Sequence, residues 1–294
     1  MRHRGGAKTA APGRRAREAE RLDIDTLFRE FQIYNNLLAI LLGMPRLFVI
    51  VQIVPFMAGS ILTGQLRATV VLSCYLVLHP TILAQLSPHD AFSTALLLNF
   101  VGLAIKEALI GFLLAYLAGI VFWVVQCAGF FIDNQRGAGQ ASVTDPLAGE
   151  QTSPIGSFLF QGATYMFFST GAFLAFLGLI YASYEIWPVT SLLPADVFRD
   201  MRIPVFFAKK VAYMMTHVML LAGPVVVACL LTDVSLGLIN RFASQLNVYV
   251  LAMPIKSGVA AFLLLLYFGM VMSGTLNMFH DIDADVQYLR MLIP

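Results

Sequence analysis

Long apolar segments separated by short polar breaks make up most of the chain. They cover residues 36–62, 68–86, 93–132, 155–184, 211–239 and 248–272. Each has close to the length of a membrane pass or more, since about 20 helical residues cross a bilayer core of roughly 30 Å. Their periodicity is helical or uniformly apolar, and none alternates like the strands of a membrane barrel. The pattern predicts an all-α, membrane-associated protein.

Prolines and charges interrupt these segments near their middles. Proline cannot donate the helical hydrogen bond, so we expect bends near Pro45, Pro80, Pro224 and Pro254. A charge at the centre of a bilayer costs about 3 kcal/mol, and irregular backbone at that depth is tolerated only inside protein or beside water. The helices are therefore predicted to be kinked and to pack mainly against other protein.

The longest segment, residues 93–132, would be about 60 Å long as one helix. It is either a bent double pass or a helix that extends beyond the bilayer. Lys106 and Glu107 lie near its middle. Neighbouring residues on a helix point about 100° apart, so we expect each to meet another helix or water rather than the other. Two interpretations stay open: an ion relay or bridge between subunits, and a helix break near the membrane surface.

A polar stripe runs along the helix predicted for residues 232–248. Its members share one helical face, given 3.6 residues per turn. They are Asp233, Gly237, Asn240, Arg241, Ser244 and Gln245. On an otherwise apolar helix such a stripe faces a partner or an aqueous path rather than lipid. The alternative is an ordinary amphipathic helix at a water interface.

A long glycine-rich loop, FFIDNQRGAGQASVTDPLAGEQTSP at residues 130–154, separates two of the most apolar segments. Beyond its first residues it has almost no apolar side chains. A phosphate-binding loop is excluded, because the glycine spacing is wrong and no lysine follows. A long loop of small residues inside a membrane protein calls for a functional explanation.

Composition supports a membrane protein. The 294 residues are 59% hydrophobic and 12% charged, whereas a soluble domain carries about 25% charge. Eight of the 19 Lys and Arg residues fall within the first 29 positions. We expect residues 1–30 to form a disordered basic tail, which either touches anionic lipid or nucleic acid or is simply solvated.

Two boundaries are predicted within the rest of the chain. Residues 31–280 form the helical domain, and a proline-containing connector at 185–204 suggests two halves, 31–187 and 205–280. Residues 281–294 form a polar end, which we expect to be solvated because it lacks the glycine turn and distal glutamate of a calcium loop.

Patterns typical of enzymes are missing from the sequence. It contains neither HExxH nor GxSxG. The three cysteines, Cys74, Cys127 and Cys229, lie far apart in apolar runs and are predicted to be small buried hydrophobes. We therefore expect no enzymatic activity, no cofactor and no metal.

Three passages resemble one family: KEALIGF at 106–112, the loop with its flanks at 128–161, and LTDVSLGLINRFASQLNVYVLAMPIKSG at 231–258. The most specific residues of the loop are Asp133, Gln135, Gly137, Asp145, Pro146, Gly149, Glu150 and Pro154. Those of the third passage are Asn240, Arg241, Gln245, Leu246, Asn247, Val248, Pro254 and Lys256. Over roughly residues 36–278, the chain resembles the T subunit of the type III secretion export apparatus, the YscT/HrcT/SpaR family, which is related to the flagellar R protein.

The resemblance implies a structural and channel-forming subunit of an export gate in the bacterial inner membrane. The helices would be broken hairpins in a helical assembly that stands partly above the bilayer. Implied partners are the R- and S-type membrane subunits, the U and V types, inner rod or needle proteins, exported unfolded protein substrates and lipid. No nucleic acid partner is expected.

The resemblance also assigns the loop, residues 133–154, the role of a channel plug. The plug residues would be Gly137, Gly139, Asp145, Pro146, Gly149, Glu150 and Pro154. Subunit contacts would be made by Lys106, Glu107, Asp133, Asp233, Asn240, Arg241, Gln245, Asn247 and Lys256. Small residues suit a plug, because it must fill a narrow lumen and still move aside for a substrate.

Two other functions remain as alternatives. A secondary transporter of small solutes would also use broken helices and intramembrane charges, but the sequence shows no internal repeat and the long loop fits it poorly. A membrane-embedded enzyme lacks a catalytic set. Migration as a large complex on a blue-native gel would favour the export gate.

Overall fold

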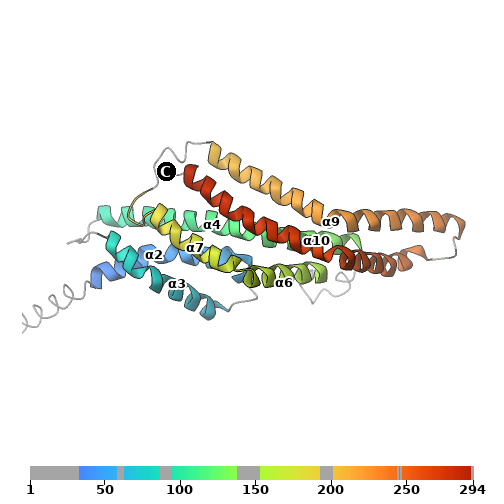
Figure 1. The fold of residues 1–294 in the computed structure, drawn as a ribbon, viewed down its shortest axis with the longest axis horizontal. Helices are drawn as coiled ribbons and strands as arrows, with labels where there is room; N and C mark the ends of the chain where they lie inside the picture. The colour runs from blue at the N-terminus through green and yellow to red at the C-terminus, as the bar shows by residue number, and fades with distance from the viewer. Residues whose placement is uncertain are drawn as a thin grey trace, which may run out of the picture.

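Seven α-helices and one 3-10 turn form the part of the chain that the computed structural model describes. That part comprises residues 33–57, 63–86, 94–137, 153–192, 201–243, 245 and 247–292, and none of them lies in a strand. The helices lie side by side in an elongated bundle (Figure 1). The prediction of an all-α protein is confirmed.

Helix α4 (Thr94–Gln135) is the central element, running along the middle of the bundle in Figure 1. It packs against α2, α6, α9 and α10. In its apolar window 67% of the residues are buried inside the bundle, against 22% for α3 and α9. The 42 residues form one uninterrupted helix, which excludes the double pass and leaves the long helix of about 60 Å.

Helix α2 (Ile33–Ile53) reaches α4 at very short range. A Cβ atom on Gly111 of α4 would lie only 2.6 Å from the backbone oxygen of Arg46. Only glycine permits this approach, because a backbone atom cannot give way as a flexible side chain can. The close contact brings Arg46 alongside Glu107, one turn earlier on α4. Helix α3 (Gly64–Gln85) follows and packs on α2.

The apolar segment 155–184, expected as one element, is two helices joined by a sharp elbow. Helix α6 (Pro154–Ser169) and α7 (Ala172–Ile186) meet at 72°. Gly171 lies at the elbow with φ of +79°, a left-handed conformation that glycine adopts readily. Phe56, in the turn η1 (Pro55–Met57) after α2, packs into the elbow, its ring centroid 4.7 Å from that of Phe167 and 5.6 Å from that of Phe176.

Helices α9 (Arg202–Phe242) and α10 (Val248–Leu292) form a long hairpin that extends past the start of α6 (Figure 1). The acidic end of the chain, expected to be solvated, continues as helix and contacts α9. Tyr213 donates to Asp281 at 2.8 Å, and Lys210 pairs with Asp285 at 2.5 Å. Tyr213 and Lys210 of α9 thus supply partners for two acidic side chains of α10.

Each of the four prolines expected to mark a bend lies inside a helix that continues on both sides of it. The sharp bend between α6 and α7 lies elsewhere. By length and composition, five of the described helices could cross a membrane, or six if α6 and α7 count together as one broken span.

Candidate functional site

The base of the glycine-rich loop is held by one buried carboxylate. Asp133, in the last turn of α4, is 3% exposed. Its oxygens accept hydrogen bonds from Arg136 Nε at 2.7 Å, from the Ser153 hydroxyl at 2.6 Å and from the Ile155 backbone N–H at 2.9 Å. Because Ser153 and Ile155 begin α6, this carboxylate ties together the two ends of segment 138–152.

The local sequence explains why α6 begins at this point. Ser153 caps the helix by accepting from the backbone N–H of Gly156 at 3.0 Å, and Pro154 takes the first helical position, where no N–H is required. A carboxylate at a helix N-terminus also meets the positive end of the helix dipole. Gly129 and Gly156 let the backbones of α4 and α6 touch, since a Cβ on Gly129 would collide with the Gly156 Cα.

The loop base also adjoins the start of α10. Arg136 reaches the Ser257 hydroxyl through a long hydrogen bond of 3.5 Å. Gly137, with φ of +88°, lies beside Met253. One residue before Ser257 along α10, Lys256 pairs with Asp233 of α9 at 3.0 Å.

The predicted residues Asp133, Pro154, Asp233 and Lys256 therefore gather at one end of the bundle. Arg136 was not among the predicted site residues, although it lies in the glycine-rich loop sequence at 130–154. The other predicted plug residues, Gly139, Asp145, Pro146, Gly149 and Glu150, lie outside the described residues.

The tip of the α9–α10 hairpin carries most of the predicted polar stripe on its exposed surface. Its exposed members are Gly237, Asn240, Arg241 and Gln245, followed by Asn247. Large apolar side chains surround them, and Phe242 is 88% exposed. Asp233 differs, because Lys256 of the same chain is its partner. An exposed face of this mixed character is typical of surfaces that meet another protein.

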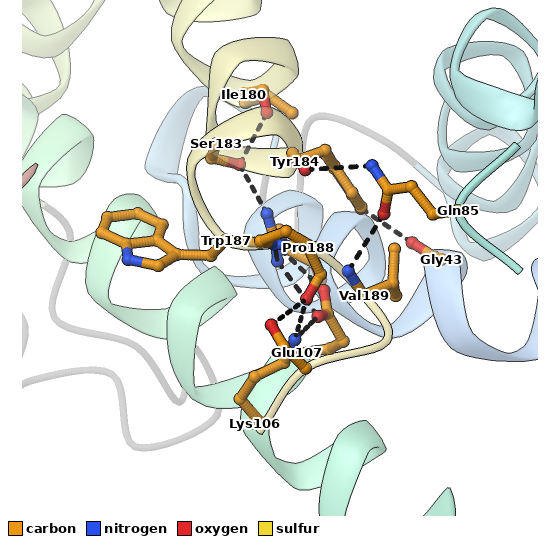
Figure 2. Close-up of polar contacts among 12 residues, drawn as sticks. Gly43, Gln85, Lys106, Glu107, Ile180, Ser183, Tyr184, Trp187, Pro188 and Val189 are labelled. Carbon is orange, nitrogen blue, oxygen red and sulfur yellow. Dashed lines mark hydrogen bonds and ion pairs between the residues drawn. The ribbon is translucent and has the colours of Figure 1, made fainter. Parts of the chain in front are cut away.

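Lys106 and Glu107 are buried in a cluster between α2, α4 and the end of α7, as Figure 2 shows. Arg46 forms a two-pronged ion pair with Glu107, from Nε at 2.7 Å and from Nη2 at 3.0 Å. Lys106 Nζ lies 2.5 Å from Glu107 Oε1 and donates to the carbonyl of Pro188 at 2.7 Å.

The expectation that Lys106 and Glu107 would not pair is wrong, because their charged groups lie 2.5 Å apart. Both residues meet partners within the chain, and at 5% and 0% exposure they present almost no surface to another subunit. Arg46 was not among the predicted site residues. The only feature of the sequence that distinguishes Arg46 is that it is a charged residue within an apolar segment.

The cluster contains two cations and one anion, so it has an excess positive charge. The end of α7 supplies the remaining partners. Arg46 Nη1 donates to the Ser183 hydroxyl and Nη2 to the Trp187 carbonyl, both at 2.9 Å, and the guanidinium lies 4.1 Å from the centre of the Tyr184 ring. Carbonyl oxygens at a helix C-terminus carry partial negative charge and stabilise cations.

Comparison with known proteins places the chain in a family. Residues 37–282 match the model of "Bacterial export proteins, family 1". The chain is 39% identical over 247 residues to the Yop proteins translocation protein T of Yersinia pestis, covering 82% of this chain and 90% of the relative. It is 31% identical over 245 residues to the surface presentation of antigens protein SpaR of Salmonella typhimurium, covering 82% and 87%. It is 34% identical over 195 residues to the flagellar biosynthetic protein FliR of Bacillus subtilis, covering 66% and 73%. With this match along most of its length, the chain belongs to family 1 of the bacterial export proteins.

Proposed function

We propose that this chain is a structural, channel-forming subunit of a type III secretion export gate in the bacterial inner membrane, with residues 133–154 as its plug. The family is one of structural export components rather than enzymes. Five apolar helices of spanning length support a membrane location. The observation that carries the plug assignment is the Asp133 carboxylate, which holds both ends of the loop at one point.

A loop held in this way suits a movable plug. The Asp133 carboxylate binds Arg136, Ser153 and Ile155, so the proposal places any movement of the plug between these anchors rather than in α4 or α6. Gly137 and Gly139 allow backbone rotation, while Pro146 and Pro154 restrict it. Asp145 and Glu150 can accept hydrogen bonds from other subunits when the channel is shut.

The exposed hairpin tip supports assembly with other membrane subunits, for which we propose the R and S types first and the U and V types next. The channel formed with them would pass unfolded substrates and the rod or needle proteins. The stripe leaves Arg241 exposed on an apolar surface, where a partner would have to supply its hydrogen-bond acceptors.

Replacing Arg241 with leucine should weaken co-purification of the chain with its partner subunits. We expect a loss of roughly tenfold in recovered complex, because an interfacial hydrogen bond to a charged group is worth about 1.5–3 kcal/mol. Blue-native gels of detergent-solubilised membranes measure it. Lys209→Leu, which also replaces an exposed cation of α9 with leucine, is the control. Unchanged assembly and secretion would mean that the stripe is a solvent-exposed face and not a subunit interface.

Replacing Asp133 with asparagine should loosen the plug without removing it. Asparagine keeps one acceptor oxygen but turns an amide donor toward Arg136 or Ser153, so at least one of the three hydrogen bonds is lost. We expect a small leak of an impermeant dye across the membrane, with normal assembly. The control is Glu185→Gln, the same change at an exposed acid. A barrier as tight as in the wild type would count against a loop held shut by its base.

A secondary transporter stays as the second candidate. The elbow between α6 and α7 and the buried charges at mid-helix are features that transporters share. A transporter would migrate on a blue-native gel without the secretion subunits, and the export gate would migrate with them.

A further inference from the structure

The chain leaving α7 is bound at successive backbone groups by cations from two other helices. Arg46 of α2 donates to the carbonyl of Trp187 at 2.9 Å, and Lys106 of α4 donates to that of Pro188 at 2.7 Å. Both are charged donors to neutral acceptors, which makes these hydrogen bonds stronger than ordinary ones. Glu107 lies between the two cations and pairs with both.

A third helix binds the same segment on both sides of these carbonyls. Gln85, the last residue of α3, donates to the carbonyl of Tyr184 at 3.5 Å and accepts from the backbone N–H of Val189 at 3.3 Å (Figure 2). Trp187 is 6% exposed and Val189 is fully buried. Side chains from α2, α3 and α4 thus fix residues 184–189, although α7 has already ended at Ile186.

The cost of burying three charges indicates that this cluster does more than stabilise the bundle. Moving two cations and one anion out of water costs several kcal/mol per ion, and well-packed apolar residues are often as stable or more so. Such a cluster instead specifies one position of the chain. Each buried donor needs an acceptor, and only one placement of the chain satisfies all of them.

We propose that Arg46, Gln85 and Lys106 form a clamp on residues 184–189, with Glu107 as counter-charge, that sets where the connector to α9 leaves the bundle. Just beyond the clamp, the Leu192 side chain comes within 3.6 Å of the Cβ position of Gly102, one turn before Lys106 on α4. Helix α9 then packs along the same helix, with Phe207 against Tyr116 at 5.7 Å between ring centroids. The clamped segment and the start of α9 thus both lie on α4, and the clamp fixes where the chain leaves the bundle toward the α9–α10 hairpin, which carries the stripe assigned to assembly.

The substitution Lys106→Met separates placement from stability. It removes the bond to Pro188 and lowers the net charge of the cluster from +1 to zero, leaving the neutral pair of Arg46 and Glu107. A neutral buried pair costs no more to desolvate than the native cluster, so the protein should accumulate normally in the membrane. Residues 188–192, by contrast, should detach from α4 more often.

A crosslink from Gly102→Cys to Leu192→Cys, made in membranes with a short bifunctional thiol reagent, reports the docked connector. Cys74, Cys127 and Cys229 are replaced by alanine in this background. We expect Lys106→Met to lower the docking equilibrium constant by about tenfold, the effect of losing one hydrogen bond to a charged group, and so to slow crosslinking. Lys209→Met, the same change at an exposed site, should leave the rate unchanged.

An unchanged rate in Lys106→Met would overturn the clamp. Loss of the Lys106→Met protein from the membrane would also overturn it, because Lys106 would then be needed for folding rather than for placement. The crosslink reports geometry within one chain, so it does not depend on the loop being a plug. Failure of the proposed function would appear instead in the Arg241→Leu and Asp133→Asn experiments.

Discussion

Membranes from cells that express Glu107→Gln should contain much less folded protein than membranes with the wild type. The change is nearly isosteric, but it leaves Arg46 and Lys106 as two buried cations without a counter-charge. Removing one partner of a buried ion pair costs roughly 3–5 kcal/mol. A protein of ordinary stability has only about 5–15 kcal/mol in total, so this single change removes much of it.

The amount of protein in the membrane fraction and the melting temperature of the purified chain measure this effect. Adding Lys106→Met to Glu107→Gln restores the net charge of +1 and should recover part of the protein. Glu185 belongs to the clamped segment, but its side chain is exposed, so Glu185→Gln should have no effect. Normal accumulation and melting of Glu107→Gln would show that the cluster is hydrated, and the clamp would lose its physical basis.

The main helices could be predicted from the sequence because their signal is local. The apolar run at 93–132 became α4, Thr94–Gln135, almost without change. The ends of the glycine-rich loop also follow from the sequence, because the apolar segments 93–132 and 155–184 stop within three residues of the helix ends at Gln135 and Pro154. The sequence does not reveal that the Asp133 carboxylate accepts hydrogen bonds from residues at both ends of the loop, Arg136 and Ile155.

Other features depend on partners far away in the sequence. Arg46 and Glu107 are separated by 61 positions, and nothing near either residue identifies the other. The elbow at Gly171 was missed because a single glycine in an apolar run is also compatible with a continuous helix. The ion pair between Lys210 and Asp285 could not be predicted either, because the two residues lie on different helices far apart in the sequence.

Deleting residues 139–148 should leave an assembled gate that leaks. The deleted piece contains few apolar side chains, so its removal takes little from the core. The chain can still close, because residues 138 and 149–152 remain to join α4 and α6, and each can span up to about 3.3–3.6 Å. The gap is short, since Arg136 and Ser153 bind the same carboxylate. Entry of a small impermeant dye, or ion current across the membrane, measures the leak.

The size of the leak should follow how much of the plug remains. The deletion should leak most, Asp133→Asn less, and Glu185→Gln no more than the wild type. Cysteines placed in the loop should crosslink to pore-facing residues of partner subunits and to a trapped substrate. If the deletion instead abolishes the whole complex, the loop is a structural element of assembly. If the barrier and secretion are both unchanged, the loop is a passive surface connection, because a segment that fills the channel cannot be shortened by ten residues without opening it.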